Sequence, residues 1–121
     1  MQRIEKDVRN LSATVSVLAA LDNAAAKKRI EETFGSDPKM VVIYRGVQAG
    51  LTQSQIAAAL SARGLRGSQQ RVSEALDDFE ELGFIERSAK GPPVPLPGWE
   101  PFGLTRVLKK TLRRNDVPDL D

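Results

Sequence analysis

The stretch GSQQRVSEALDDFEELGFIER, residues 67 to 87, combines a polar start with apolar residues at helical spacing. Val72, Ala75, Leu76 and Phe79 fall on one face of such a helix, with a spacing typical of helices that read DNA. The opposite face carries one amide and three carboxylates: Gln70, Glu74, Asp77 and Glu81. Because carboxylates repel phosphates, the polar start and the acidic face of this helix favour different partners. Its polar start suits nucleic acid, and its acidic face suits a basic partner.

Catalytic chemistry has few residues to work with in this chain. There is no histidine and no cysteine, so the commonest general base, thiolate metal sites and disulfides are all excluded. We find no pairing of carboxylates and lysines that would replace them. We therefore expect a protein that is not an enzyme and that uses no metal and no cofactor.

Charge and hydropathy indicate a globular protein with an uneven basic excess. The net charge is +2 and the isoelectric point is about 9.2, which permits an acidic partner such as nucleic acid. Residues 88–114 hold six basic and one acidic residue, so the excess follows the helix discussed above. No apolar run approaches the roughly 18 residues that span a bilayer, and the N-terminus lacks a signal-like apolar block. We expect a cytoplasmic location without membrane contact.

The N-terminal segment has an apolar seam in steps of four, three, four and three, which is a heptad pattern. Valine and leucine at the core positions favour a two-stranded pairing, so we expect a homodimer. Beyond Leu18 a weaker stripe continues at Leu21, Ala26, Ile30 and Phe34 on the same or a second helix, and the alternative is a long helix that packs on its own core. The expected dimerisation residues are Ile4, Val8, Leu11, Val15 and Leu18.

Capping signals predict three helices before the proline-rich segment. The first begins at Pro38 after Ser36 or Asp37, and the second follows a capping box of Thr52 and Gln55. The third has Ser68 as its N-cap, ends near Leu82, and leads into a strand at Phe84 and Ile85. These signals predict a mainly α fold with a small β element.

The segment GPPVPLPGWEPFG, residues 91–103, holds five of the seven prolines and the only tryptophan. Since proline cannot donate to a sheet ladder, we expect an ordered loop or polyproline arm rather than a regular two-stranded ribbon. Trp99 and Phe102 are interpreted as core residues, with an exposed anchor for a partner as the alternative. Thr105 is expected to cap a last helix, followed by a fraying tail.

This order of elements resembles the winged helix-turn-helix superfamily, especially MarR-like and ArsR-like regulators. The resemblance is carried by LTQSQIAAAL as the supporting helix, by GSQQRVSEALDDFEELGFIER as the recognition helix and first wing strand, and by FGLT before the final helix. It implies a winged helix-turn-helix domain at residues 36–114 with a proline-rich wing at 91–103. An N-terminal helical dimerisation segment (1–35) would precede it, and a flexible tail (115–121) would follow.

The resemblance also implies which side chains would contact DNA. Gln69 and Gln70 would pair with adenine edges, and Arg71 with guanine or a phosphate. Ser68 and Ser73 would donate to phosphate oxygens, while Arg87 and Lys90 would be wing contacts. The full expected DNA-binding set is Thr52, Gln53, Ser68, Gln69, Gln70, Arg71, Ser73, Glu74, Arg87 and Lys90.

Two function classes follow from this sequence. The first is a dimeric transcriptional regulator that reads the major groove of double-stranded DNA with helix 68–82. The second is an assembly subunit in which the same scaffold binds a protein, either through the acidic helix face or through the proline-rich arm. Salt-sensitive binding to duplex DNA favours the first class, and a basic protein partner favours the second.

Overall fold

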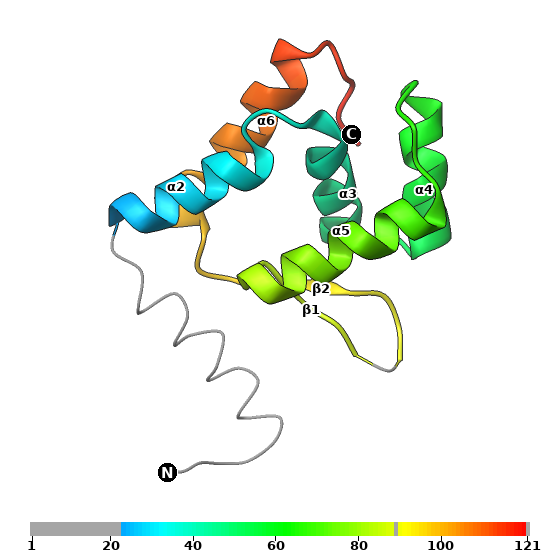
Figure 1. The fold of residues 1–121 in the computed structure, drawn as a ribbon, viewed down its shortest axis with the longest axis horizontal. Coiled ribbons are helices and arrows are strands. Elements are labelled where there is room, and N and C mark those ends of the chain that lie inside the picture. Colours follow the sequence, from blue (N-terminus) through cyan, green and yellow to red (C-terminus); the bar gives the residue numbers. More distant parts are fainter. Residues whose placement is uncertain (1–22, 89, 121) are drawn as a thin grey trace.

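The computed structural model describes residues 23–88 and 90–120, and the expected dimerisation seam from Ile4 to Leu18 lies outside them. The described chain is mainly helical with one small antiparallel sheet, which confirms the expected mainly α fold with a small β element (Figure 1). No helix within these residues is long and apolar enough to cross a membrane. The elements are α2 (Asn23–Phe34), α3 (Pro38–Gln48), α4 (Gln53–Ala62), α5 (Gln69–Leu82), β1 (Ile85–Glu86), β2 (Val94–Pro95), the 3-10 helix η1 (Glu100–Phe102) and α6 (Leu104–Arg114).

The starts of α3, α4 and α5 confirm the predicted caps. The Asp37 carboxylate accepts a hydrogen bond from the Lys39 backbone N–H at 3.0 Å, one residue after Pro38 begins α3. Thr52 and Gln55 form the reciprocal capping box of α4. Each cap satisfies backbone donors that the first turn of a helix leaves without partners. These helix starts are therefore determined by residues next to them in sequence.

The start of α6 differs from the sequence prediction. The helix begins at Leu104 after Gly103, whose φ of 87° lies in the left-handed region, and Thr105 makes no capping bond. Instead, the carboxylate of Glu100, in the preceding η1, accepts a hydrogen bond from the Thr105 hydroxyl at 2.6 Å and another from the Thr105 backbone N–H at 3.3 Å. The prediction of a Thr105 cap was wrong because the acceptor comes from the preceding turn.

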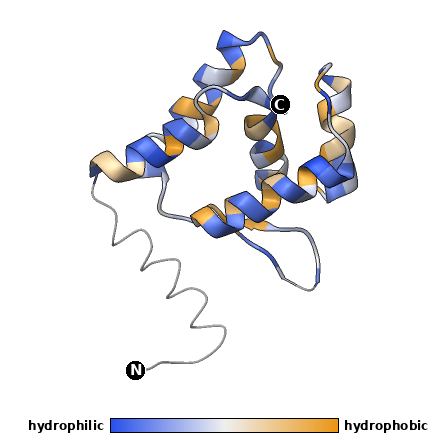
Figure 2. Cartoon of the chain, in the orientation of Figure 1, coloured by the Kyte–Doolittle hydropathy of each residue, from blue (hydrophilic) through white to orange (hydrophobic). Residues whose placement is uncertain are grey.

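An aromatic cluster forms the centre of the core. Phe34 lies 5.2 Å from Tyr44 and 5.1 Å from Phe84, measured between ring centroids, and the Trp99 ring lies 4.2 Å from that of Phe84. Trp99 is 1% exposed, and its Nε1 donates to the Gly83 carbonyl at 2.9 Å, so the core interpretation of Trp99 is confirmed. The buried apolar residues of the helices belong to the same hydrophobic cluster. Figure 2 shows hydrophobic and hydrophilic residues alternating along the helices. Burial of these rings supplies much of the driving force for folding.

Helix α2 is part of the same core. Its buried residues Ala26, Ile30 and Phe34 belong to the hydrophobic cluster that also contains residues of α3, α5 and α6. The Arg29 guanidinium donates to the Leu82 carbonyl at 3.3 Å, which ties α2 to the end of α5. Residues 23–34 thus pack with residues 36–114, although the sequence pattern grouped them with a separate N-terminal segment.

The sheet is short because prolines surround its second strand. Ile85 pairs with Pro95 and Glu86 with Val94, in antiparallel register. The Leu96 backbone N–H then donates to the Phe84 carbonyl at 2.9 Å, which extends the pairing by one bond beyond the proline. Since Pro95 has no N–H to donate, the ladder cannot continue as a regular ribbon.

The residues after α6 fold back onto the helices, whereas the sequence predicted a fraying tail. Asp119 accepts hydrogen bonds from the Arg45 guanidinium of α3 at 2.9 and 3.1 Å. Arg63, at the end of α4, donates to the carbonyls of Pro118 and Asp119 at 2.8 and 2.9 Å. Residues 115–120 therefore connect α3 with α4. The contacts that hold this segment come from Arg45 and Arg63, which are more than 50 residues away in sequence.

Candidate nucleic-acid interface

The first turn of α5 presents its polar side chains to solvent. Ser68, Gln69, Gln70 and Arg71 are exposed, and Ser73 is half-buried. The reason is the helical period, since Val72, Ala75, Leu76 and Phe79 take the inward positions. The Ser68 Oγ accepts a hydrogen bond from the Arg71 backbone N–H at 3.1 Å and still has its own proton to donate. This turn can offer hydrogen bonds to a groove edge without rearrangement.

The start of α4 lies beside this turn. The Gln53 side-chain amide donates to the Gln69 backbone carbonyl at 3.2 Å, which places the exposed Thr52 next to the start of α5. The connection between the helices passes close to α4 at Gly67. A Cβ added at this position would lie 2.3 Å from the Leu60 Cδ1. A residue without a side chain is thus required there. The structure brings the expected contacts of α4 and α5 together.

Arg66 is a candidate contact that the sequence analysis missed. It is exposed in the connection that leads into the N-cap of α5, two positions before Ser68. A cation at the start of a helix that faces DNA can bind a phosphate beside the groove. The signal in the sequence is a basic residue two positions before a capping serine.

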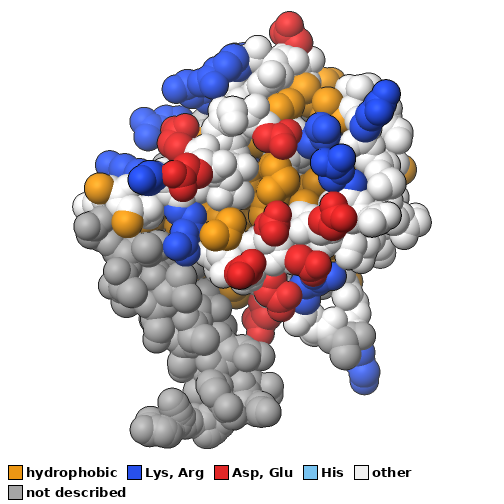
Figure 3. All heavy atoms as spheres, viewed as in Figure 1, with side chains coloured by type: hydrophobic (Ala, Val, Ile, Leu, Met, Phe, Trp, Pro, Cys, Tyr) orange, Lys and Arg blue, Asp and Glu red, His pale blue; other side chains and the backbone are white. Residues whose placement is uncertain are grey.

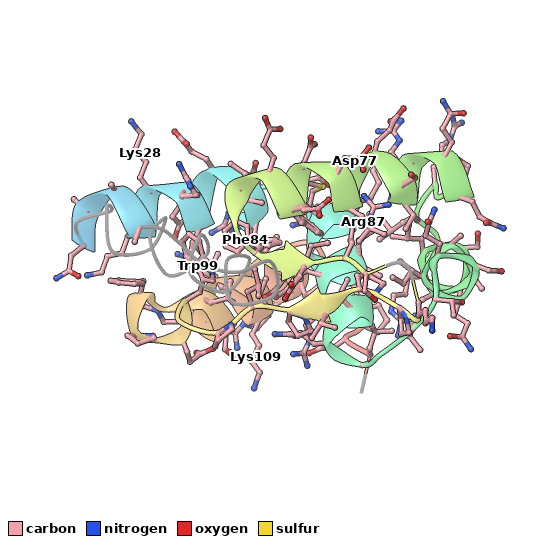
Figure 4. The ribbon with its side chains drawn as sticks, turned by 90° about the horizontal axis from the view of Figure 1, so that it is seen from below. Lys28, Asp77, Phe84, Arg87, Trp99 and Lys109 are labelled. Carbon is pink, nitrogen blue, oxygen red and sulfur yellow. The ribbon has the colours of Figure 1, made fainter. Side chains whose placement is uncertain are left out.

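The two expected wing residues are placed differently from each other. Arg87 forms ion pairs with Asp77, its closer partner, and with Glu80 at 3.9 Å, so its guanidinium is directed at α5 (Figure 4). Lys90 is exposed in the loop between β1 and β2, where its carbonyl accepts a hydrogen bond from the Ser88 hydroxyl. In Figure 1 this loop projects toward the end of the molecule at which α5 begins. Of the two expected wing residues, Lys90 is therefore the exposed one that is available to a ligand.

The later turns of α5 are acidic. Five carboxylates follow Arg71 along the helix: Glu74, Asp77, Asp78, Glu80 and Glu81. Basic residues of α6 lie elsewhere, and Figure 4 shows Asp77 and Lys109 pointing to opposite sides of the molecule. The exposed cations of α6 are Arg106, Lys109, Lys110, Arg113 and Arg114. One straight duplex cannot lie against both surfaces.

A groove runs along one flank of α5. It has a volume of about 710 Å³, lies between α2, the start of α3 and the end of α5, and is lined in part by Met40 and Leu82. A smaller hollow of about 120 Å³ continues it past Ile43 and Ala75. Figure 3 shows apolar side chains in this depression, with acidic and basic side chains around it. The sequence alone does not predict this groove, because three helices are needed to form it.

The comparisons with known proteins add no relative. The chain matches no protein-family model, no curated protein and no solved structure. Among the described residues, no group of three or more acidic side chains is arranged to hold a metal ion. The start of α5, with Gln53 bonded to it and Arg66 just before it in sequence, is therefore identified as a candidate from its own geometry.

Proposed function

We propose that this protein binds double-stranded DNA through the first turn of α5, as a transcriptional regulator of the winged helix-turn-helix kind. The observation that carries the proposal is the exposed polar start of α5, where Gln69, Gln70 and Arg71 stand beside the start of α4. Side chains in the first turns of a recognition helix are those that reach base edges in the major groove. Glutamine and arginine are the residues that pair in bidentate fashion with adenine and guanine.

The arrangement around α5 supports this proposal. Helices α3, α4 and α5 precede the short sheet, and the loop between the strands projects toward the start of α5 (Figure 1). A duplex against the first turn of α5 would lie close to Lys90 in that loop and to Arg66 before the helix. Both cations are exposed and can bind phosphates on either side of the groove.

The acidic residues of α5 are compatible with this docking, with one exception. Asp77 is paired with Arg87, and Asp78 and Glu81 line the groove on the flank. Glu74 forms no ion pair within residues 23–88 and 90–120, and it lies one turn after Gln70. Glu74 is then the residue that selects against unfavourable sites, because a carboxylate near the groove is tolerated where it meets a cytosine amino group.

The seam at Ile4, Val8, Leu11, Val15 and Leu18 is proposed to join two copies. In such a dimer each α5 would read one half-site, and the two half-sites would be centred about 34 Å apart, one turn of DNA. The expected operator is accordingly a palindrome or a close approximation to one.

The test is selection from a pool of random duplexes at two salt concentrations, followed by titration of the selected site. We expect enrichment of a palindromic sequence, and a roughly tenfold loss of affinity in Gln70→Ala, the size expected for one lost base contact. Arg71→Ala should also lower the slope of log affinity against log salt by about 1 if it binds a phosphate.

Lys109→Ala is the matched control, since it removes a cation from the side of the molecule opposite Asp77. Its effect on the affinity for the selected duplex should be small. Absence of binding at low salt would reject the proposal. Loss of affinity in Lys109→Ala without loss in Arg71→Ala would move the DNA site from α5 to α6.

A further inference from the structure

The groove beside α5 has an apolar floor that the core does not fully cover. Met40 and Leu82 are half-buried, pack against the core, and line the groove together with residues of α2. Ile43 and Ala75 extend this floor in the adjoining hollow. A surface of this shape binds ligands mainly by burying apolar side chains, and its border decides which ligands are accepted.

The border of the groove is predominantly acidic. Glu32, Asp37, Asp78 and Glu81 line the larger part, and Glu74 lines the adjoining hollow. The three cations on the same lining are Arg29, Lys39 and Arg71, and the Arg29 guanidinium already donates to the Leu82 carbonyl. Asp78 and Glu81 form no ion pair with any other described residue. Their charge is available to a partner.

We propose that this groove binds a lysine- or arginine-rich amphipathic helix of a partner protein. The apolar stripe of that helix would lie on Met40 and Leu82, and its cations would meet the carboxylates of α2 and α5. An amphipathic helix in a hydrophobic groove is a common form of peptide recognition. Charge complementarity selects a basic helix, because an acidic one would place like charges against Asp78 and Glu81.

The larger part of this groove shares no residue with the proposed DNA contacts, whereas the adjoining hollow is lined by Arg71 and Glu74, which belong to both sites. Asp78 lies two turns after Gln70, and the other walls of the groove belong to α2 and α3. The acidic border repels a phosphate backbone, so DNA is a poor occupant of the groove. The two proposals can still fail independently, because the groove is tested by changes at Glu32, Asp78 and Glu81, none of which is a proposed DNA contact.

Met40 provides a direct reporter of occupancy. The chain has two methionines, and Met40 lies on the groove floor. With the ε-methyl groups of the full chain labelled with ¹³C, the Met40 signal is assigned by its loss in Met40→Leu. The probe is a synthetic 18-residue helical peptide with a leucine stripe flanked by lysines. Two matched peptides serve as comparisons, one with the same composition but scattered leucines, and one with glutamate in place of lysine.

The expected result is that the striped lysine peptide alone shifts the Met40 signal in a saturable manner. Reversal of the border charge in Asp78→Lys/Glu81→Lys should weaken its binding about tenfold, as expected for two exposed ion pairs. Glu32→Lys should weaken it about threefold. Glu31→Lys is the matched control, because Glu31 is exposed on the same helix without lining the groove.

Three results would overturn the proposal: a Met40 signal unmoved by millimolar peptide, equal binding of the scattered peptide, or equal weakening by Glu31→Lys. Circular dichroism checks that each variant is folded. If the double reversal unfolds the protein, the neutral variant Asp78→Asn/Glu81→Gln takes its place, with an expected loss of about threefold. The selected DNA duplex, titrated against the same variants, should bind at least as well as it binds the unmodified chain.

Discussion

Tyr44 and Trp99 are buried and place a polar atom in the core, where each donates to a backbone carbonyl. The two carbonyls differ in whether they accept a second hydrogen bond. The Tyr44 hydroxyl donates to the Phe84 carbonyl at 3.3 Å, and that carbonyl also accepts the Leu96 backbone N–H. Trp99 Nε1 donates to the Gly83 carbonyl at 2.9 Å. A buried carbonyl that loses its partner costs free energy, whereas one that keeps a second partner costs much less.

Trp99→Phe is therefore expected to destabilise the protein far more than Tyr44→Phe. The tryptophan change removes a hydrogen bond and leaves a cavity against Phe84, with an expected cost of about 3 kcal/mol. The tyrosine change should cost about 1 kcal/mol or less. Urea denaturation followed by circular dichroism measures both without relying on tryptophan fluorescence. Equal costs would show that the Gly83 carbonyl finds another partner.

The titration of Tyr44 gives a pH prediction. Burial, helped by the nearby Glu100 carboxylate, raises the pKa of Tyr44 from 10.0 to about 12. A raised pKa means that the folded state holds its proton where the unfolded state has lost it, so stability falls as the pH rises from 10 to 12. Tyr44 is the only tyrosine, so tyrosinate absorbance in the folded protein reports it alone. In Tyr44→Phe the alkaline loss of stability should be smaller; an unchanged loss would assign it to other groups.

At the scale of the helix, Ser68 has two separable roles. Its hydroxyl caps α5, and the proposal also places it at the DNA backbone. Ser68→Ala should destabilise the protein by about 1 kcal/mol and weaken DNA binding. Ser68→Asp should restore the cap, because aspartate is an equally good N-cap, yet it should bind DNA even less well through repulsion of phosphate. Thermal melts and DNA titration separate the two effects. Recovery of DNA binding in Ser68→Asp would mean that Ser68 acts only as a cap.

Helix starts were predictable wherever the cap lies within three residues of the turn it serves. Asp37, Thr52 with Gln55, and Ser68 meet that condition, and the structure confirms all three. The start of α6 does not, because Glu100 reaches it across η1. The polar side chains of the candidate DNA interface could be predicted from the helical period of α5. The pairing of Arg87 with Asp77 could not, since it depends on how the strand returns beside the helix.

At the scale of the molecule, the C-terminal residues act as a clasp across α3 and α4. Burial alone would raise the pKa of Asp119, but hydrogen bonds from Arg45 and from the Leu120 backbone N–H, with the charges of Arg45 and Lys109, lower it below its ordinary value of 3.8. A lowered pKa means that the contact is fully formed above the ordinary value and is lost as the pH falls below it.

Asp119→Asn should release residues 115–120 at neutral pH, because the neutral asparagine amide cannot form an ion pair with the Arg45 guanidinium. Hydrogen exchange of the Leu120 amide, which donates to the Asp119 carboxylate at 2.7 Å, measures the release. Asp116→Asn is the control, since Asp116 is exposed and asparagine tolerates its φ of 56°. Equal exchange in both variants would show that Arg63 alone holds the segment.

Neither the clasp nor the groove could be predicted from the sequence. Arg45 and Asp119 are 74 residues apart, and no local pattern relates them. The groove needs Met40 of α3, Leu82 of α5 and Glu32 of α2 at one place, which only the packing of the aromatic cluster brings about. Local chemistry thus predicted the helices and their polar faces, and the assembly of three helices produced the second candidate site.

The acidic later turns of α5 and the exposed cations of α6 give the molecule a charge asymmetry, and Asp77 and Lys109 point to opposite sides of it (Figure 4). Under the proposed DNA binding, a duplex at long range would attract the basic α6 side first, so that an encounter through α5 would require the protein to turn over after capture. Salt weakens the bound complex. It also screens the attraction between the duplex and the α6 side beyond about 8 Å at physiological ionic strength. The rate of association should therefore fall less steeply with salt than it does for a protein whose reading helix is itself basic.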